Sequence, residues 1–291
     1  MRKNRKRKTI LHSAMRQNAM SRAGGRRPLV VAALAALVAA LSVGGYLAYS
    51  RLRAIWMEQC VLTDVERQVT VSTGTNIKPG LILDQFGLLK KGANLAEIDF
   101  EKKRNDILRR IPNIRSLTVS RHLPDRLEIA VEEREPIARM KVRGSKGVTG
   151  RVVDAEGVVF VREAGTSLLP VIYEAKSSFT AAGKTLSGRA AAALRMLEAC
   201  RMDKDLAGLG IVEVYTHHLD YLIATLDNYS LAKIAWEGMD APTAGTDDLM
   251  LDQLRHFCSS KRTAAESGAT VKVWNVTLPG IATADTKEPI L

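Results

Sequence analysis

The sequence predicts an α+β protein with a single N-terminal transmembrane helix, followed by a small β-α-α-β-β unit and a β-rich domain with packed helices. Three observations support this prediction. Residues 28–50 carry no charged side chain, short helical and alternating patterns follow one another over residues 68–136, and strand patterns mixed with two amphipathic helices fill residues 137–281.

The uncharged segment 28–50 is long enough to cross a membrane, because ~1.5 Å per helical residue gives about the thickness of a ~30 Å hydrocarbon core. Residues 1–27 hold ten Lys and Arg and no acid, whereas residues 51–291 hold 33 basic and 31 acidic residues. The positive-inside rule therefore predicts a basic cytoplasmic tail over 1–27, a transmembrane helix over 28–50 and a juxtamembrane linker over 51–67.

A cleaved signal peptide is the competing interpretation of this N-terminus, since residues 48–50 offer a weak small-x-small cleavage site. The apolar run is longer than the ~7 to 15 residues of a signal core, and the basic leader is long as well. We therefore expect a retained single-pass type II anchor, with the N-terminus inside and the bulk of the chain exported.

Small residues recur along the predicted transmembrane helix. Ala32, Ala36 and Ala40 are four residues apart and share a face that would let a second helix approach closely. An alanine-rich helix without a partner fits the same pattern.

Residues 68–136 alternate between strand and helix patterns. Residues 68–73 alternate polar and apolar side chains, and residues 76–88 have helical spacing that Pro79 interrupts near the start. Asp99 caps a firmer helix that ends at Pro112. Two alternating strands follow, over residues 117–120 and 127–131, and the turn 121–126 joins them.

The same residues resemble the polypeptide-transport-associated (POTRA) domain of the bacterial cell-division proteins FtsQ and DivIB. The likeness rests on an ordered series that begins at residues 92–95 and ends in Glu-Arg-x-Pro-x-Ala at residues 133–138. It implies a POTRA domain over 68–136, a β domain over 137–281 and a C-terminal tail over 282–291. Its motif residues here are Arg121, Pro124, Glu133, Arg134 and Pro136.

The residue types alone predict roles for some of these positions, without the family resemblance. Glu133 and Arg134, at a strand end, are predicted to form a solvated ion pair contributing ~0 to 1 kcal/mol. Residues 154–157 are predicted to form the turn of a hairpin between strands 152–153 and 158–160.

The β domain is predicted to contain a helix over 189–202, a meander of strands over 211–214, 221–226 and 229–236, and a helix over 247–258 that Thr246 caps. Residues 271–278 alternate before Pro279 and are predicted to be the last strand, at a sheet edge. An edge strand can bind a partner by strand addition. The candidate partner-binding residues are Val271, Val273, Trp274, Val276 and Leu278.

Nothing in the sequence indicates catalysis or a cofactor. The five histidines have no partners at metal-site spacing, and no nucleophile elbow or phosphate-binding glycine loop is present. Cys60, Cys200 and Cys258 fit no zinc template, and although a bridge between the last two is conceivable, buried free thiols are favoured. We expect no enzyme, cofactor, metal or small-molecule substrate.

The resemblance implies a non-enzymatic membrane scaffold of the division septum that binds FtsB/FtsL-like single-span proteins and other septal proteins. Two alternatives belong to other classes. A POTRA-bearing component of outer-membrane assembly or secretion usually leads into a long β-barrel, for which too few residues follow Ala138. A membrane-tethered nucleic-acid binder would use the basic residues 2–8, although no nucleic acid is expected.

Overall fold

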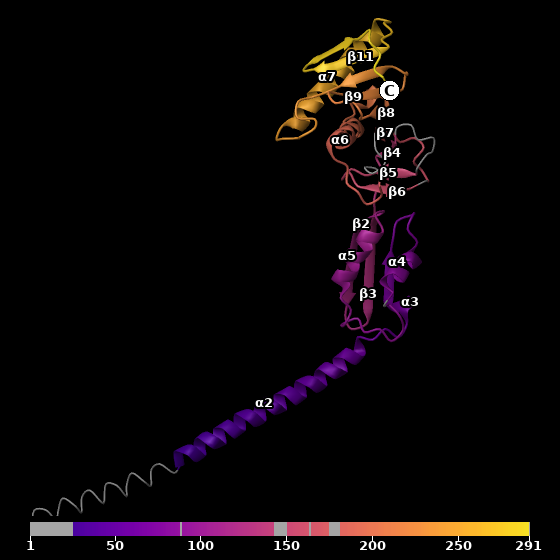
Figure 1. Ribbon diagram of the computed structural model, residues 1–291. Helices are drawn as coiled ribbons and strands as arrows, with labels where there is room; N and C mark the ends of the chain where they lie inside the picture. The colour runs from indigo at the N-terminus through magenta and orange to yellow at the C-terminus, as the bar shows by residue number, and fades with distance from the viewer. Residues whose placement is uncertain (1–25, 88, 143–149, 163, 175–180, 291) are drawn as a thin grey trace, which may run out of the picture. The chain divides into compact units, whose positions relative to one another are not determined.

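The structure is a computed structural model that describes residues 26–87, 89–142, 150–162, 164–174 and 181–290 (Figure 1). The predicted cytoplasmic tail, apart from its last two residues, lies outside these ranges. The chain divides into two compact units. The first comprises the residues up to Gln68 together with Lys90–Ile98 and His122–Arg126, and the second comprises the remaining residues.

The first unit is built on one long helix, α2 (Arg26–Gln59). The most apolar 18-residue window of its segment Val30–Gln59 has a mean hydropathy of 2.2, and none of that window is buried within the protein. By length and composition this helix can cross a membrane. It continues nine residues past the predicted boundary at Ser50, and the short helix α3 (Val65–Gln68) follows.

The second unit begins with a three-stranded sheet in the order β1-β3-β2. The short strand β1 (Val69–Ser72) pairs in parallel with β3 (Arg126–Glu133), which neighbours β2 (Ile114–His122). The helices are α4 (Pro79–Phe86) and α5 (Phe100–Arg110), and the Asp99 side chain accepts a hydrogen bond from the Lys102 N–H, as an N-cap does. The predicted β-α-α-β-β order is confirmed, although Leu88, the end of the first predicted helix, lies outside the described residues.

A nine-stranded mixed sheet forms the rest of the second unit, in the order β12-β11-β10-β9-β8-β7-β4-β5-β6. Its first five strands along the chain are β4 (Ala138–Val142), β5 (Arg151–Val153), β6 (Val159–Val161), β7 (Val171–Glu174) and β8 (Ile211–Tyr215). Strands β9 (Leu222–Leu226), β10 (Leu231–Ile234), β11 (Val273–Leu278) and β12 (Ile281–Ala284) complete it. The antiparallel run β8-β9-β10 is the predicted meander.

Two helices cover the core of this sheet. Helix α6 (Gly188–Met202) buries Ala193, Leu194 and Leu197, and helix α7 (Thr246–Glu266) buries Leu254 and Phe257. The 3₁₀ helix η2 (Ala207–Leu209) lies between α6 and β8. These side chains join the inward-facing residues of the sheet in one apolar cluster, so the predicted β-rich domain with packed helices is confirmed.

Helix α7 differs from its prediction at both ends. Gly245 is the N-cap residue, and Thr246 is the first residue of the helix. The Thr246 hydroxyl does not cap the helix, because it accepts a hydrogen bond from the N–H of Thr243, which precedes the helix. The helix also runs eight residues past Cys258, to Glu266. The predicted end followed the apolar face, whereas the polar last two turns continue because no Gly or Pro interrupts them before Gly268.

Candidate functional site

The predicted edge strand, β11, lies inside the sheet. It pairs in parallel with β10 on one side, through Leu231 and Val273, and antiparallel with β12 on the other, through Asn275 and Thr283. The prediction that residues 271–278 form the last strand at an edge is therefore wrong. Gly280, at φ +67°, lets the chain turn after Pro279 and return as β12.

The candidate partner-binding side chains of β11 are mostly core residues. Val273, Trp274 and Val276 are no more than 5% exposed, and the Trp274 ring contacts the ring of Phe257 from α7 at 5.6 Å between centroids. Val271 is half-buried and precedes the strand, whereas Leu278 is 59% exposed at its end. These five residues therefore do not form one exposed row.

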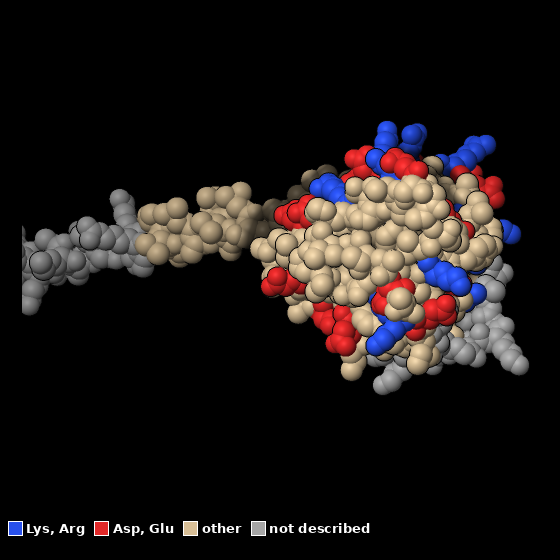
Figure 2. Space-filling model, turned by 90° about the horizontal axis from the view of Figure 1, so that it is seen from above, with Lys and Arg blue, Asp and Glu red and all other residues tan. Residues whose placement is uncertain are grey.

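The end of the sheet is instead β12. Among the described residues, β11 is its one neighbouring strand, so the other side of β12 is open. No charged residue occurs between Val273 and Ala284, although sheet edges ordinarily carry charges that discourage pairing. Figure 2 looks down on the part of the larger sheet that carries the label β11 in Figure 1, and it shows a broad surface without Lys, Arg, Asp or Glu.

The orientation of β12 can be read from its hydrogen bonds. The N–H of Asp285, just beyond the strand, donates to the carbonyl of Val273 at 2.7 Å. Because inward and outward amides alternate along an antiparallel strand, the amide of Ala284, which lies opposite Trp274, points away from β11. Ala284 thus presents a backbone donor to the open edge.

A buried glutamine holds the turn that leads into β12. Gln253 of α7 is 4% exposed, and its Nε2 donates to the carbonyls of Val276 and Leu278 at 2.9 and 2.7 Å. Its Oε1 accepts from the Gly280 N–H at 2.9 Å. Sequence reasoning missed Gln253, because a single polar residue on an amphipathic helix gives no sign that its carboxamide binds a distant turn.

The predicted C-terminal tail is also part of the domain. Residues 282–284 belong to β12, and the Asp285 carboxylate forms an ion pair with Lys233 at 2.7 Å. The Lys233 hydrogen bond lowers the pKa of Asp285. Further on, the Ile290 carbonyl lies 3.0 and 3.1 Å from the Nε2 atoms of His217 and His218. The composition of residues 282–291 predicted a tail because it does not reveal these contacts, which are made mainly by backbone atoms and one carboxylate.

Glu133 and Arg134 do not pair with each other. The Glu133 carboxylate accepts from the backbone N–H groups of Asn76 and Ile77, the latter at 2.7 Å, and from the Asn76 side chain. Burial opposes the charge on Glu133, but these hydrogen bonds outweigh it and lower its pKa. The predicted solvated ion pair is wrong, because successive side chains of an extended chain point to opposite sides.

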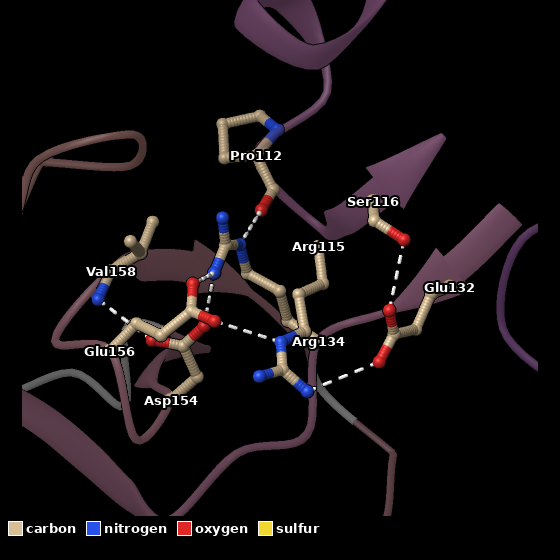
Figure 3. A network of polar contacts seen from close by, with 8 residues as sticks. All are labelled: Pro112, Arg115, Ser116, Glu132, Arg134, Asp154, Glu156 and Val158. Atoms are coloured by element: carbon tan, nitrogen blue, oxygen red, sulfur yellow. Dashed lines mark hydrogen bonds and ion pairs between the residues drawn. The ribbon is translucent and has the colours of Figure 1, made fainter. Parts of the chain in front are cut away.

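Arg134 is instead the partly buried centre of a polar network (Figure 3). Its side chain is 13% exposed, and its Nη1 contacts Asp154, which is 6% exposed, and Glu156 at 2.8 Å. Its Nε donates to the Pro112 carbonyl at 3.0 Å. Asp154 also accepts from the Val158 N–H at 2.8 Å, in the hairpin turn predicted between β5 and β6.

A second arginine extends the network on its solvent side (Figure 3). The Arg115 Nε donates to Glu156 at 2.8 Å, and its Nη1 donates to Glu132 at 3.1 Å, which also accepts from Ser116. Hydrogen bonds from Arg134 and then Arg115 lower the pKa of Glu156. The network thus ties the β2-β3 sheet to the β5-β6 turn of the larger sheet.

The remaining motif residues lie apart from this network. Arg121 stacks over the Phe100 ring at 5.2 Å, Pro124 lies in the turn between β2 and β3, and Pro136 is part of the connection from β3 to β4. Ala32, Ala36 and Ala40 are exposed along α2. Their predicted role in helix association stays a prediction.

The three cysteines are free thiols, as predicted. Cys60 and Cys258 are buried and Cys200 is partly buried, and the Cys258 thiol donates to the Asp205 carbonyl at 3.1 Å. Burial raises the pKa of Cys200 to about 12. Within the described ranges, no three His, Cys, Asp or Glu side chains are grouped so that they could hold a metal ion.

Comparison with known protein families assigns the three-stranded sheet and its helices α4 and α5 to a known domain type. Residues 66–134 match the family of the POTRA domain, FtsQ-type. No curated protein matches the chain. The chain is therefore a POTRA-domain protein with one N-terminal apolar helix.

The FtsQ-type domain confirms the POTRA resemblance seen in the sequence, and its position directly after that helix is consistent with the FtsQ/DivIB family. This type of domain indicates a division-related protein, in a family that is generally non-enzymatic.

Proposed function

We propose that the chain is a non-enzymatic, single-pass scaffold of the bacterial division machinery. Residues 1–27 would be cytoplasmic, α2 would span the inner membrane, and the POTRA and β domains would lie on the extracytoplasmic side at the septum. The FtsQ-type domain directly after one apolar helix supports this arrangement, and the basic residues before that helix support its orientation.

The partners in this proposal are FtsB/FtsL-like single-span proteins, bound by strand addition at β12. The observation that carries the proposal is a charge-free edge strand in the sheet beyond an FtsQ-type domain. Strand addition relies on backbone hydrogen bonds, so it does not require particular side chains on β12. The POTRA motif residues contribute to the fold of the adjacent domain in this account.

The scaffold would act without chemistry of its own. Bringing two partners to one membrane-anchored chain raises their effective concentration, which converts a second encounter into an intramolecular one. A rigid edge supports this role better than a mobile one would. Here β11, Gln253 and the ion pair of Asp285 with Lys233 all hold β12 and the residue after it in place.

Imaging tests this proposal in cells. An N-terminal fluorescent fusion should form a band at midcell, and depletion of the native protein should give undivided filaments. Uniform membrane fluorescence together with normal division would contradict the division role. It would leave the POTRA domain as a fold without this function.

A further inference from the structure

A hollow of about 410 Å³ lies in the first unit, beside the part of α2 that leaves the apolar span. Six of its seven lining residues come from one face of α2, and the seventh, Glu97, comes from the segment Lys90–Ile98. The α2 residues are Tyr46, Tyr49, Ser50, Arg53, Ala54 and Met57.

Backbone hydrogen bonds build the wall that carries Glu97. The amide of Leu62 donates to the Ala93 carbonyl at 2.8 Å, and the amide of Leu95 donates to the Cys60 carbonyl at 2.9 Å. The Asn94 side chain donates to the carbonyl of Met57 at 3.0 Å, at the end of α2. The segment is therefore fixed against the helix, and Leu95 is fully buried.

The hollow lies where the helix passes from hydrocarbon to water. The 34 residues of α2 extend ~50 Å, which exceeds the ~30 Å hydrocarbon core by ~20 Å. If the uncharged stretch begins the span at Pro28, a crossing of ~20 residues ends near Tyr49. Tyrosines favour this interfacial level, so the hollow opens among the lipid headgroups.

The charges that line the hollow are one positive and one negative. Arg53 and Glu97 are both exposed, and neither has an ion-pair partner among the residues the structure describes. A guanidinium recognises phosphate, and a carboxylate accepts hydrogen bonds from a primary ammonium. The two side chains therefore complement a headgroup that carries both groups.

We propose that this hollow binds the headgroup of one aminophospholipid, with its phosphate at Arg53 and its primary ammonium at Glu97. The proposal rests on the membrane-spanning role of α2 in the proposed function. An anionic headgroup without an amine would leave Glu97 facing a negative charge. A choline headgroup has no N–H to donate to Glu97. Binding would seat the first unit at the membrane surface.

The test is lipid binding by the purified, delipidated full-length chain, measured by native mass spectrometry in detergent. Phosphatidylethanolamine, phosphatidylcholine and phosphatidylglycerol are titrated separately. The wild-type chain should bind one phosphatidylethanolamine about tenfold more tightly than either other lipid, the effect of one charge-assisted contact of ~1.4 kcal/mol. Glu97→Gln should abolish the preference over phosphatidylcholine.

Arg51 supplies a matched control for Arg53. The two residues carry the same charge one half-turn apart, so on an α-helix they point in directions about 160° different. Arg53→Gln should weaken phosphatidylethanolamine binding about tenfold by loss of the phosphate contact, whereas Arg51→Gln should leave it unchanged.

Equal losses in the two variants, tightest binding of phosphatidylglycerol, or equal binding of all three lipids would overturn the headgroup site. Recovery of the wild-type chain in the membrane fraction is scored separately. Its absence there would overturn the membrane-spanning role, while its presence with equal lipid binding would overturn the headgroup site alone.

Discussion

Replacement of Arg134 by alanine should destabilise the second unit more than any other single change in its polar network. The substitution removes a guanidinium that is 13% exposed and leaves the carboxylate of Asp154, 6% exposed, without its charged partner. Breaking a buried ion pair from one side costs about 3 to 5 kcal/mol. We take the lower figure, about 3 kcal/mol, because Asp154 keeps its hydrogen bond from the Val158 N–H.

Thermal unfolding of the full-length chain in detergent, followed by circular dichroism, measures this effect. At about 2 to 4 °C per kcal/mol for a domain of this size, Tm should fall by about 6 to 12 °C. Arg115→Ala is the matched control, because Arg115 is an arginine of the same network that is 52% exposed and pairs with Glu156 and Glu132, which are 47% and 54% exposed. Exposed pairs contribute about 1 kcal/mol or less.

The reasoning fails if Arg115→Ala lowers Tm as much as Arg134→Ala does. It also fails if the double variant Arg134→Met with Asp154→Asn, which keeps an acceptor oxygen for the Val158 N–H, is no more stable than Arg134→Met alone. Removing both members of a buried pair should recover stability, because no uncompensated charge remains.

Three further predictions concern acid, the β12 turn and the Cys200 thiol. The pKa of Glu156 is lower in the folded chain than in the unfolded chain, where it is about 4.3. The charged Glu156 therefore stabilises the fold at a pH above about 4.3, and this stabilisation is lost as the pH falls through the pKa of the folded chain. Urea unfolding at pH 7 and pH 3.5 should therefore show a smaller difference in Arg134→Ala than in the wild type, and an equal difference would contradict the linkage. Gln253→Ala should cost about 2 to 3 kcal/mol in urea unfolding, because it leaves buried carbonyls unsatisfied, whereas an unchanged midpoint would show that the carboxamide does not hold the turn. Cys200 should resist a thiol reagent at pH 8 until the chain unfolds, because burial raises its pKa and thiolate is the reactive form. Rapid labelling of Cys200 in the folded chain would refute this.

The sequence predicted those parts of the fold that depend on local patterns. Alternation and helical periodicity predicted β1, α5 and the meander, and Asp99 marked the start of α5 because its cap acts within one turn. The hairpin turn at residues 154–157 was also predictable from a local signal, because Gly157 is the residue type that favours positive φ in such turns. Gly157 adopts φ +78° in the structure.

Contacts between distant segments could not be predicted in this way. Glu133 and Arg134 are adjacent in the chain, but their partners lie at Asn76 and at Asp154, so their spacing gave no sign of either contact. The sequence prediction placed the edge of the sheet one strand too early, because β12 has only four residues and they show no clear polar–apolar alternation. Their strand character depends on pairing with β11.

Capture of an FtsB/FtsL-like partner by the full-length chain tests the strand-addition account most directly. Ala284→Pro removes a backbone donor that points to the open edge and keeps the Asp285 amide that binds Val273. The lost bond and the acceptor left unpaired on the partner should cost about 2 to 4 kcal/mol, or about 30-fold to 1,000-fold in Kd. Ala284→Val keeps the donor and should bind as the wild type does. Equal capture by Ala284→Pro and Ala284→Val, with the fold of both intact, would contradict binding at β12.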